Sequence, residues 1–126
     1  MMVLKHPVSQ SNLTKGKMME NEKDPDGINQ HEVGAKLDVD KPKAALVLGG
    51  FPLALMEVVK VGTFGANKYS PNGWKAVSNG EARYMDAAMR HILADMNNET
   101  VDKDSQCLHL AQAVWNLLAV IEFRVD

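Results

Sequence analysis

The sequence predicts an all-α fold, a small helical bundle, on three observations. Apolar residues recur at the three- and four-residue spacing of a helix in three segments between residues 52 and 124. Strong turn signals separate these segments, above all the Ser-Pro-Asn-Gly sequence at residues 70–73. No segment of useful length alternates apolar and polar residues as a strand would. The 126 residues, of which 45% are hydrophobic and 24% charged, suit one such domain.

In the N-terminal part of the chain, the sequence pattern predicts no helix or strand. Residues 1–32 are polar and show no helical or strand period, so we expect a flexible arm followed by one domain over residues 33–126. The beginning of that domain is loop-like, because Pro42 disfavours helix at the residue before it. Gly49 and Gly50 then interrupt the chain before the first helix.

The first helix is predicted over residues 52–67, with Pro52 in the first helical position. Its buried stripe is expected to consist of Leu53, Met56, Val59 or Lys60, and Phe64. The second helix is predicted to begin near Ser78, which forms a capping box with Glu81. Its expected core face consists of Met85, Met89, Ile92 and Met96.

The third helix is predicted to begin between Asp102 and Ser105 and to end near Arg124. It carries two apolar faces. One consists of Leu108, Ala111, Trp115 and Leu118, and the other of Leu110, Val114, Leu117 and Ile121. A helix that is apolar on two faces is buried from two sides, and three helices alone make a thin bundle. We therefore expect oligomerisation, as a dimer or a tetramer, to complete the bundle.

Composition and charge exclude several classes of function. The net charge of −2 and the pI near 6.1 give no general attraction for nucleic acid or an anionic membrane. The longest apolar run, residues 107–120, is too short to span a bilayer, which takes about 20 residues. Cys107 is the only cysteine, so we expect no internal disulfide and no zinc–cysteine site, and a cytoplasmic location. There is also no glycine-rich phosphate loop and no His-Asp dipeptide.

A polar stripe runs along the third predicted helix. Residues 105–121 contain no charged side chain, yet His109, Gln112 and Asn116 recur at i, i+3 and i+7 within them. This spacing places the three side chains on one side of a helix. Polar groups beside faces that must be buried need partners, so the stripe indicates either bonds across the bundle or a binding site.

The second predicted helix carries a charged stripe with the same spacing. Arg83, Asp86 and Arg90 lie one turn apart, and Glu99 and Asp102 follow after the helix. Magnesium binds carboxylate oxygens together with substrate phosphates, and guanidinium groups match phosphate geometry. The two stripes together therefore favour a metal-bound polyphosphate as ligand.

Each of these features also has an ordinary interpretation. Asp86 and its neighbouring arginines would form surface ion pairs of about 0.3–0.5 kcal/mol each. Asp102 would cap the third helix, and His91 would be oriented by Asp95 one turn later. His109 alone is more typical of a satisfied core residue than of a metal ligand. The combination, not any single residue, carries the functional hypothesis.

Short motifs throughout the chain have a familiar pattern. They are Gly34-Ala-Lys-Leu-Asp, Lys41-Pro, Val61-Gly-Thr-Phe-Gly-Ala-Asn-Lys-Tyr, Asn72-Gly-Trp, Arg83-Tyr-Met-Asp-Ala, Arg90-His, Glu99-x-x-Asp102-x-x-Ser105, His109 and Trp115-Asn116. In combination, over about residues 33–124, they resemble the phage-associated dATP/dGTP diphosphohydrolases, the MazZ-like group of the MazG-like enzymes.

The resemblance implies a nucleoside triphosphate pyrophosphohydrolase with the all-α, MazG-like fold. Such an enzyme cleaves between the α and β phosphates and releases a nucleoside monophosphate and pyrophosphate. It uses Mg²⁺ or Mn²⁺ held by carboxylates where two helices meet, and it assembles as a dimer or tetramer. The implied substrates are dGTP and dATP, and dGMP would feed synthesis of 2-aminoadenine nucleotides in the cytoplasm of a phage host.

Site residues follow from the stripes together with the resemblance. The expected metal ligands are Asp86, Glu99, Asp102 and His109, the last as a ligand or as an orienting group; the expected catalytic residues are Asp86, His91, Glu99 and Asp102. The expected substrate-binding residues are Lys36, Lys41, Lys68, Trp74, Arg83, Arg90 and Asn116. For Trp74, stacking on the base and packing against the second helix are equally favoured.

Two questions stay open from the sequence. The second half of the MazG-like metal motif corresponds to Glu99-x-x-Asp102 by spacing, but to His109-x-x-Gln112 when helices are aligned; Asp86 belongs to the site in both alignments. The alternative functions are a noncatalytic helical assembly protein, whose polar stripes fix helix register, and a nucleotide sensor without turnover.

Overall fold

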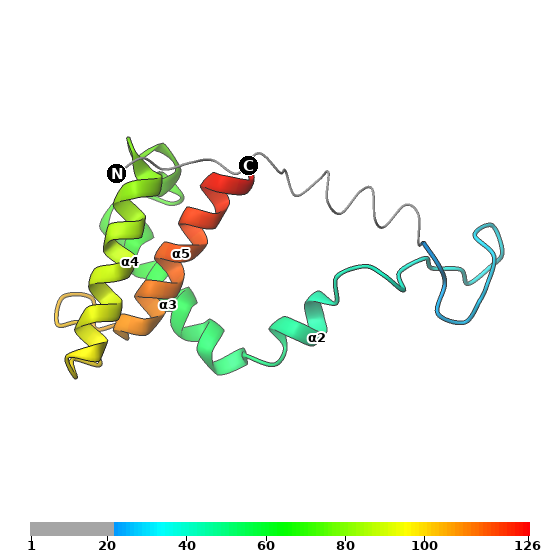
Figure 1. Ribbon diagram of the computed structural model, residues 1–126, viewed down its shortest axis with the longest axis horizontal. Helices are drawn as coiled ribbons and strands as arrows, with labels where there is room; N and C mark the ends of the chain where they lie inside the picture. The colour runs from blue at the N-terminus through cyan, green and yellow to red at the C-terminus, as the bar shows by residue number, and fades with distance from the viewer. Residues whose placement is uncertain (1–21) are drawn as a thin grey trace.

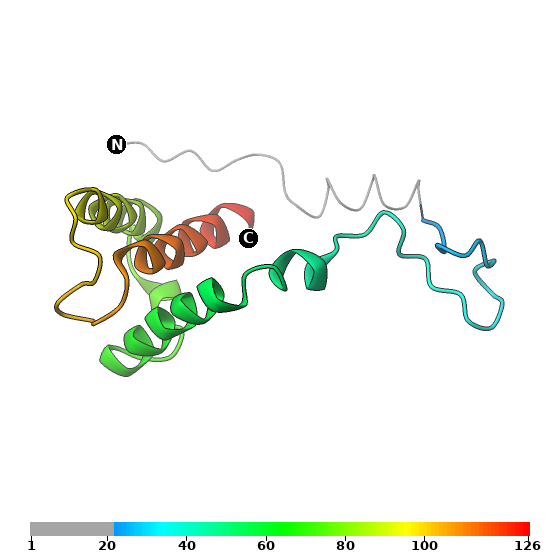
Figure 2. The ribbon, with the colours of Figure 1, turned by 90° about the horizontal axis from the view of Figure 1, so that it is seen from below.

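The structure, a computed structural model, describes residues 22–126, and this part of the chain contains helices and turns but no strand (Figures 1 and 2). The helices are α2 (Ala44–Leu48), α3 (Pro52–Lys68), the short 3₁₀ helix η1 (Gly73–Ala76), α4 (Gly80–Met96) and α5 (His109–Val125). The predicted all-α fold is confirmed. None of these helices is long and apolar enough to cross a membrane.

Helices α4 and α5 form an antiparallel pair, and α3 packs across one side of it (Figures 1 and 2). Ala88 of α4 is completely buried, so the two helices approach closely where it lies. An ion pair between Glu81 and Arg124 joins the first turn of α4 to the last turn of α5. The pair is therefore held by small side chains along its length and by opposite charges at one end.

One cluster of the core lies between α3 and α5. Its buried side chains are Val58, Val61, Cys107 and Ala111, with Leu108 and Trp115 packed against them. Gly62 lets the indole of Trp115 approach α3, since a Cβ atom there would lie 3.1 Å from its Nε1 atom. Cys107 is thus a small buried side chain in a hydrophobic core.

The predicted buried stripe of the first helix is wrong, although its bounds are confirmed to within a residue. Leu53, Met56 and Val59 are more than half exposed, and Phe64 is half-buried. Val58 and Val61 are buried instead. α3 has apolar residues on several faces and one main partner, α5, so the contact with that partner selects the buried face.

The predicted core face of the second helix is wrong in part. Met85 and Ile92 are half-buried, but Met89 and Met96 point to solvent. The face that meets α5 includes Ala88 instead, because a close antiparallel contact admits small side chains better than long ones.

Two predicted helix starts are also wrong. α4 begins at Gly80 after Asn79, whose φ of 52° is left-handed, and no side chain caps it; Ser78 is not the cap. α5 begins at His109, several residues later than predicted, because residues 101–108 fold back as a loop. In this loop the Asp102 amide donates to the Cys107 carbonyl, and Val101 pairs with Leu108 in an isolated antiparallel bridge.

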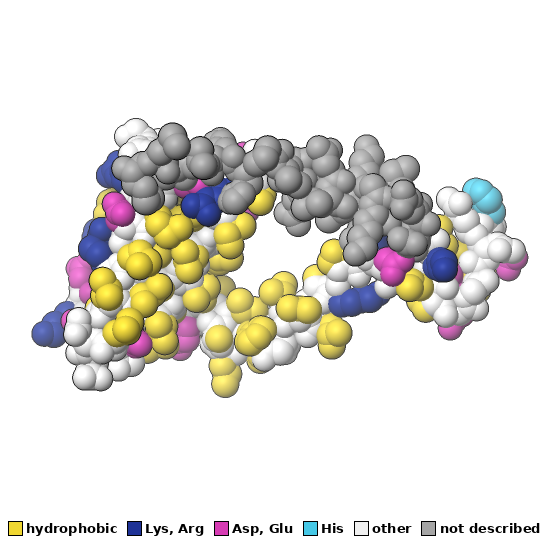
Figure 3. Space-filling view, in the orientation of Figure 1, with side chains coloured by type: hydrophobic (Ala, Val, Ile, Leu, Met, Phe, Trp, Pro, Cys, Tyr) yellow, Lys and Arg dark blue, Asp and Glu magenta, His cyan; other side chains and the backbone are white. Residues whose placement is uncertain are grey.

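One side of the α4–α5 pair is an uncovered apolar surface. It consists of Leu110, Val114, Leu118 and Ile121 of α5 and Met89, Leu93 and Met96 of α4, all between 43% and 71% exposed. Figure 3 shows hydrophobic side chains gathered over these helices. We call this set the α4–α5 apolar face. α5 thus has a covered and an uncovered apolar face, but the predicted membership is wrong for two residues: Leu118 belongs to the uncovered face, and Leu117 is half-buried.

The segment before α2 lies away from the other helices (Figures 1 and 2). Asp24 organises it: its buried carboxylate accepts hydrogen bonds from the backbone amides of Asp26, Ile28 and Lys36, at 2.7, 3.3 and 2.8 Å. The predicted arm over residues 1–32 falls largely on residues 1–21, outside the described residues, and the domain boundary stays a prediction.

Candidate functional site

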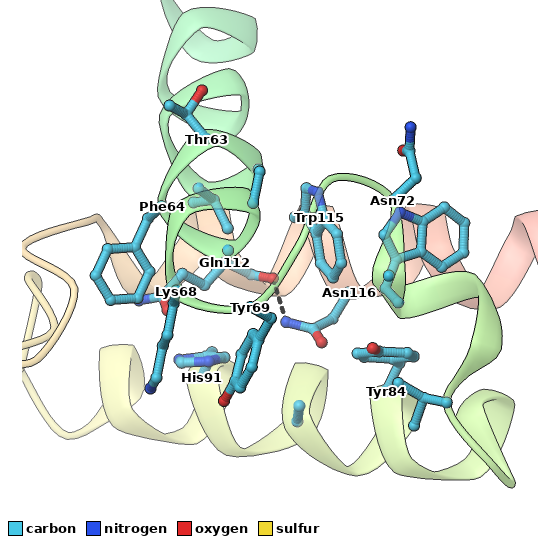
Figure 4. A pocket seen from close by; sticks show the side chains of 18 of the residues that line it. Thr63, Phe64, Lys68, Tyr69, Asn72, Tyr84, His91, Gln112, Trp115 and Asn116 are labelled. Atoms are coloured by element: carbon cyan, nitrogen blue, oxygen red, sulfur yellow. Dashed lines mark hydrogen bonds between the residues drawn. The ribbon is translucent and has the colours of Figure 1, made fainter.

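A cavity of about 1110 Å³ lies between α3, α4 and α5 (Figure 4). This volume is slightly above the range of about 300–1,000 Å³ that is typical of small-molecule sites. The structure brings eight of the predicted site residues to its walls: Lys68, Trp74, Arg83, Asp86, Arg90, His91, Asp102 and Asn116. The charged stripe and two residues of the polar stripe, Gln112 and Asn116, therefore line one cavity, whereas His109 and Glu99 are not part of its wall.

Two histidines and an aspartate meet at one end of the cavity. His91 comes from α4, Asp102 from the loop after it, and His109 from the first position of α5. One nitrogen of each imidazole and one carboxylate oxygen lie within 4.8 Å of one another, and the two Nδ1 atoms are 2.9 Å apart. We call these three residues the His–Asp cluster. Nitrogen and carboxylate donors of this kind are those that bind divalent transition metals.

Asp102 is fixed by the loop and by α5. Its Oδ1 atom accepts a hydrogen bond from the Asp104 amide at 2.9 Å, and its Oδ2 atom accepts one from Gln112 Nε2 at 3.1 Å. Burial raises the pKa of Asp102, but these hydrogen bonds and the nearby histidines outweigh burial and hold that pKa below its usual value. At neutral pH the Asp102 carboxylate is therefore ionised and held in one orientation, so its oxygens can bind a metal ion.

His91 is held in its neutral form. Burial lowers the pKa of His91, and electrostatic interaction with His109 and Arg90 lowers it further, against the opposing effect of Asp102. A neutral imidazole offers one nitrogen lone pair, which can accept a proton or bind a metal.

His109 is buried, with 6% of its surface exposed. Its Nε2 atom lies 3.5 Å from Glu99 Oε1, an ion-pair distance, but it makes no hydrogen bond to any described residue. A buried polar atom without a partner costs free energy, so this nitrogen marks His109 as more than a core residue.

The two alignments left open by the sequence converge in space. Gln112 donates to Asp102, and His109 lies in the same cluster as Asp102. The segment Glu99-x-x-Asp102 and the segment His109-x-x-Gln112 thus belong to one site. The loop that delays the start of α5 folds the first segment onto the second.

The cationic side chains of the cavity are held less firmly than the His–Asp cluster. Lys68 Nζ lies 3.4 Å from Asp104 Oδ2 and over the rings of Phe64 and Tyr69. Arg83 donates to the Ser78 carbonyl at 3.2 Å. These contacts are exposed and weak, so the side chains can exchange them for an anionic ligand.

Asp86 stands on the cavity wall on the exposed side of α4. Within residues 22–126 it forms no ion pair, with Arg83, Arg90 or any other group. The ordinary interpretation as a surface ion pair is therefore wrong for this part of the chain.

Trp74 packs within an aromatic cluster. Its ring meets those of Tyr84, Trp115 and Phe123 edge-on, with centroids 6.4, 5.8 and 5.6 Å away. This is the packing role that the sequence left open beside base stacking. Asn116 is buried at the cavity wall and donates from Nδ2 to the Gln112 carbonyl at 2.7 Å (Figure 4).

Some predicted site residues lie elsewhere, and some wall residues have no predicted role. Lys36 and Lys41 belong to the segment before α2 and do not line the cavity. Sequence reasoning missed Tyr69 and Asp104 at the wall. Gln112, which belongs to one of the two alignments of the metal motif, is also at the wall.

Residues 31–126 match the model of a family described as dATP/dGTP diphosphohydrolase, N-terminal. The match covers most of the chain and confirms the resemblance drawn from the short motifs. No curated protein and no solved structure matches the chain.

Proposed function

Since the chain belongs to the dATP/dGTP diphosphohydrolase N-terminal family, we propose that it hydrolyses dGTP or dATP to the nucleoside monophosphate and pyrophosphate. The family match over residues 31–126 is the observation that carries this proposal. The cavity supports it, because carboxylate, imidazole and cationic side chains face one nucleotide-sized space.

The proposed reaction depends on a divalent metal, Mg²⁺ or Mn²⁺. Such an ion neutralises charge on the triphosphate and activates water for attack on the α-phosphorus. The proposed ligands are Asp86, Asp102 and His109, with His91 beside them. Glu99 is proposed as a further ligand or, from its position 3.5 Å from His109 Nε2, as the group that orients that imidazole.

The cationic residues are proposed to bind the triphosphate. Lys68, Arg83 and Arg90 line the cavity on α3 and α4, and guanidinium groups can hold two phosphate oxygens each. Lys68 would exchange its exposed contact with Asp104 for a phosphate oxygen. Asn116 is proposed to contact the nucleoside, and any contact of Trp74 with the base would be added to its packing role.

Product analysis tests the reaction. Full-length protein is incubated with each dNTP and Mg²⁺ or Mn²⁺, with a chelator as the control, and the products are separated. We expect dGMP or dAMP with pyrophosphate, because the carboxylate and cationic side chains at the cavity suit attack of metal-activated water on the α-phosphorus. Formation of dNDP and inorganic phosphate, or of deoxynucleoside and triphosphate, contradicts the proposal.

The same assay separates the two alternative functions. A nucleotide sensor would bind a dNTP without forming products, and a noncatalytic assembly protein would do neither. The proposed setting is the cytoplasm of a phage host, where dGMP from this reaction would enter synthesis of 2-aminoadenine nucleotides.

We also propose that the active form is a dimer or tetramer. The α4–α5 apolar face supports this, because it exposes seven large apolar side chains on two neighbouring helices. Soluble monomers rarely expose large contiguous apolar patches. A second copy would cover it. The segment before α2 projects from its own bundle, so Lys36 and Lys41 would reach phosphates bound in the second copy (Figure 2).

A further inference from the structure

The His–Asp cluster differs from a typical magnesium site. Mg²⁺ binds carboxylates, waters and phosphates and keeps several of its own water molecules, whereas two of the three donors here are imidazoles. Imidazole nitrogen suits Fe²⁺, Co²⁺ and Zn²⁺ better. We propose that His91, Asp102 and His109 form a site for a transition-metal ion, which the protein holds without nucleotide.

This inference deepens the proposed function by naming the class of resident metal. It divides the ligands proposed above between two ions: Asp102 and His109 hold the resident metal, and Asp86 is left for the Mg²⁺ that a triphosphate brings. Asp86, a lone carboxylate on the exposed side of α4, is suited to that second ion, because Mg²⁺ often binds through one or two carboxylates plus phosphates.

The spacing of the donors supports a bound ion. Donors at 2.0 to 2.2 Å from one metal lie about 3 to 3.5 Å from each other. The His91 and His109 Nδ1 atoms are 2.9 Å apart, slightly closer than that and within hydrogen-bond distance. All three donor atoms lie within 4.8 Å of one another, so small side-chain shifts would let them share one ion. The three donors come from α4, the following loop and α5, so one ion would join all three segments.

The surroundings of His109 favour the tautomer that binds metal. A proton on Nδ1 would leave the Nε2 lone pair facing the Glu99 carboxylate, which is an unfavourable contact between two acceptors. A proton on Nε2 instead places an N–H group beside the Glu99 carboxylate, 3.5 Å away, and leaves the Nδ1 lone pair on the side of the cluster. A carboxylate behind a ligating histidine is the usual arrangement at such sites.

Asp102 is oriented in a similar way. Gln112 and the Asp104 amide each bond one of its oxygens, so the carboxylate enters the cluster with little freedom to rotate. Ligating carboxylates are commonly held by such outer hydrogen bonds. Both anionic and imidazole donors are thus positioned before any ion binds.

The test uses Co²⁺ as the probe, with full-length protein stripped by a chelator and no nucleotide present. Binding is measured by equilibrium dialysis and by the visible absorption of Co²⁺. We expect one Co²⁺ per chain, displaced by Zn²⁺ but not by millimolar Mg²⁺. Absence of Co²⁺ binding, or displacement by an equal concentration of Mg²⁺, overturns the proposal.

Variants assign the site. His91→Ala and His109→Ala should abolish Co²⁺ binding, and Glu99→Gln, at a partly exposed side chain, should weaken it about 10- to 100-fold. The control is His31→Ala, an exposed histidine in the segment before α2, which should bind as the unaltered protein does. If a histidine variant fails to fold, the test rests on Glu99→Gln. Unchanged Co²⁺ affinity in that variant contradicts the assignment of the metal site to the His–Asp cluster.

The result is independent of the hydrolysis assay. A stripped protein that forms dNMP with Mg²⁺ alone and binds no Co²⁺ refutes only the transition-metal site. A protein that binds Co²⁺ through these residues but forms no dNMP with any metal refutes only the proposed reaction.

Discussion

Asp86 lies between two arginines on α4 without pairing with either. An aspartate in an ion pair would be satisfied on its own helix, and its replacement would change little. An unpaired carboxylate at a cavity wall is available to a ligand. At the scale of single residues, therefore, Asp86 distinguishes the interpretation as a metal ligand from the interpretation as a surface ion pair.

Replacing Asp86 by asparagine removes the charge while keeping the size. If Asp86 binds metal with the triphosphate, Asp86→Asn should lower kcat by about 100-fold or more, because metal stabilisation of the transition state amounts to several kcal/mol. The melting temperature should stay the same. Steady-state kinetics and thermal unfolding measure both quantities.

The matched control is Glu122→Gln, which removes an exposed charge on α5 outside the cavity. It should leave kcat and melting temperature unchanged. An Asp86→Asn protein with full activity would show that Asp86 has no part in catalysis.

At the scale of elements, glycine positions show how closely the helices approach. A Cβ atom at Gly80, the first residue of α4, would lie 2.8 Å from Phe123 Cζ on α5. Phe123 cannot easily move, because it stacks on Tyr84 and meets Trp74 edge-on. Gly65 in α3 is different, since nothing lies within 4 Å of a Cβ atom there.

The same substitution should therefore have opposite effects at these two glycines. Gly80→Ala should lower the free energy of unfolding by about 1–3 kcal/mol through overpacking. Gly65→Ala should raise it by about 0.5–1 kcal/mol, since alanine favours a helix interior. Denaturant titration measures both values. Equal effects of the two substitutions would mean that the contact between Gly80 and Phe123 is not close.

The elements also differ in how far local sequence predicts them. The bounds of α3 follow from Pro52 and the turn after it, and they are confirmed. The start of α5 is not predicted, because residues 101–108 have good helical signals but form hydrogen bonds across a loop instead. A local sequence pattern does not reveal whether a segment forms one more helical turn or makes a tertiary contact of similar energy.

At the scale of the whole molecule, the α4–α5 apolar face is the feature that a single chain leaves unsatisfied. Leu118 lies near the middle of its α5 row and is 50% exposed. A second copy meeting this face through a symmetric contact would bury the same row on both chains. The assembly would then include the segment before α2 of each chain.

We expect a dimer or tetramer at micromolar concentration, with activity lost on dissociation. Leu118→Glu should shift the protein to a monomer and reduce hydrolysis, because it places a charge in the buried contact. Light scattering and product formation measure the two effects. The control is Ala76→Glu, an equal charge on the exposed side of η1. A fully active monomer of the unaltered protein would contradict both parts of the prediction.

The sequence by itself determines the all-α class, the approximate segments of the helices and eight polar or aromatic residues of the cavity wall. These follow from local rules: a residue's face on a helix depends on spacing alone, so Arg83, Asp86 and Arg90 share a side wherever the helix packs. The family match extends this local information, since its motifs are also short segments of sequence.

Only the tertiary structure decides which apolar face is buried and which polar groups meet. Met89 and Val58 are both apolar on helices, but only Val58 is covered by a neighbouring helix. His91 and His109 are 18 residues apart, and their Nδ1 atoms meet only because α4 and α5 are antiparallel and the intervening loop is tight. Burial and contact between distant residues depend on where other helices lie, and helical periodicity carries no information about that position.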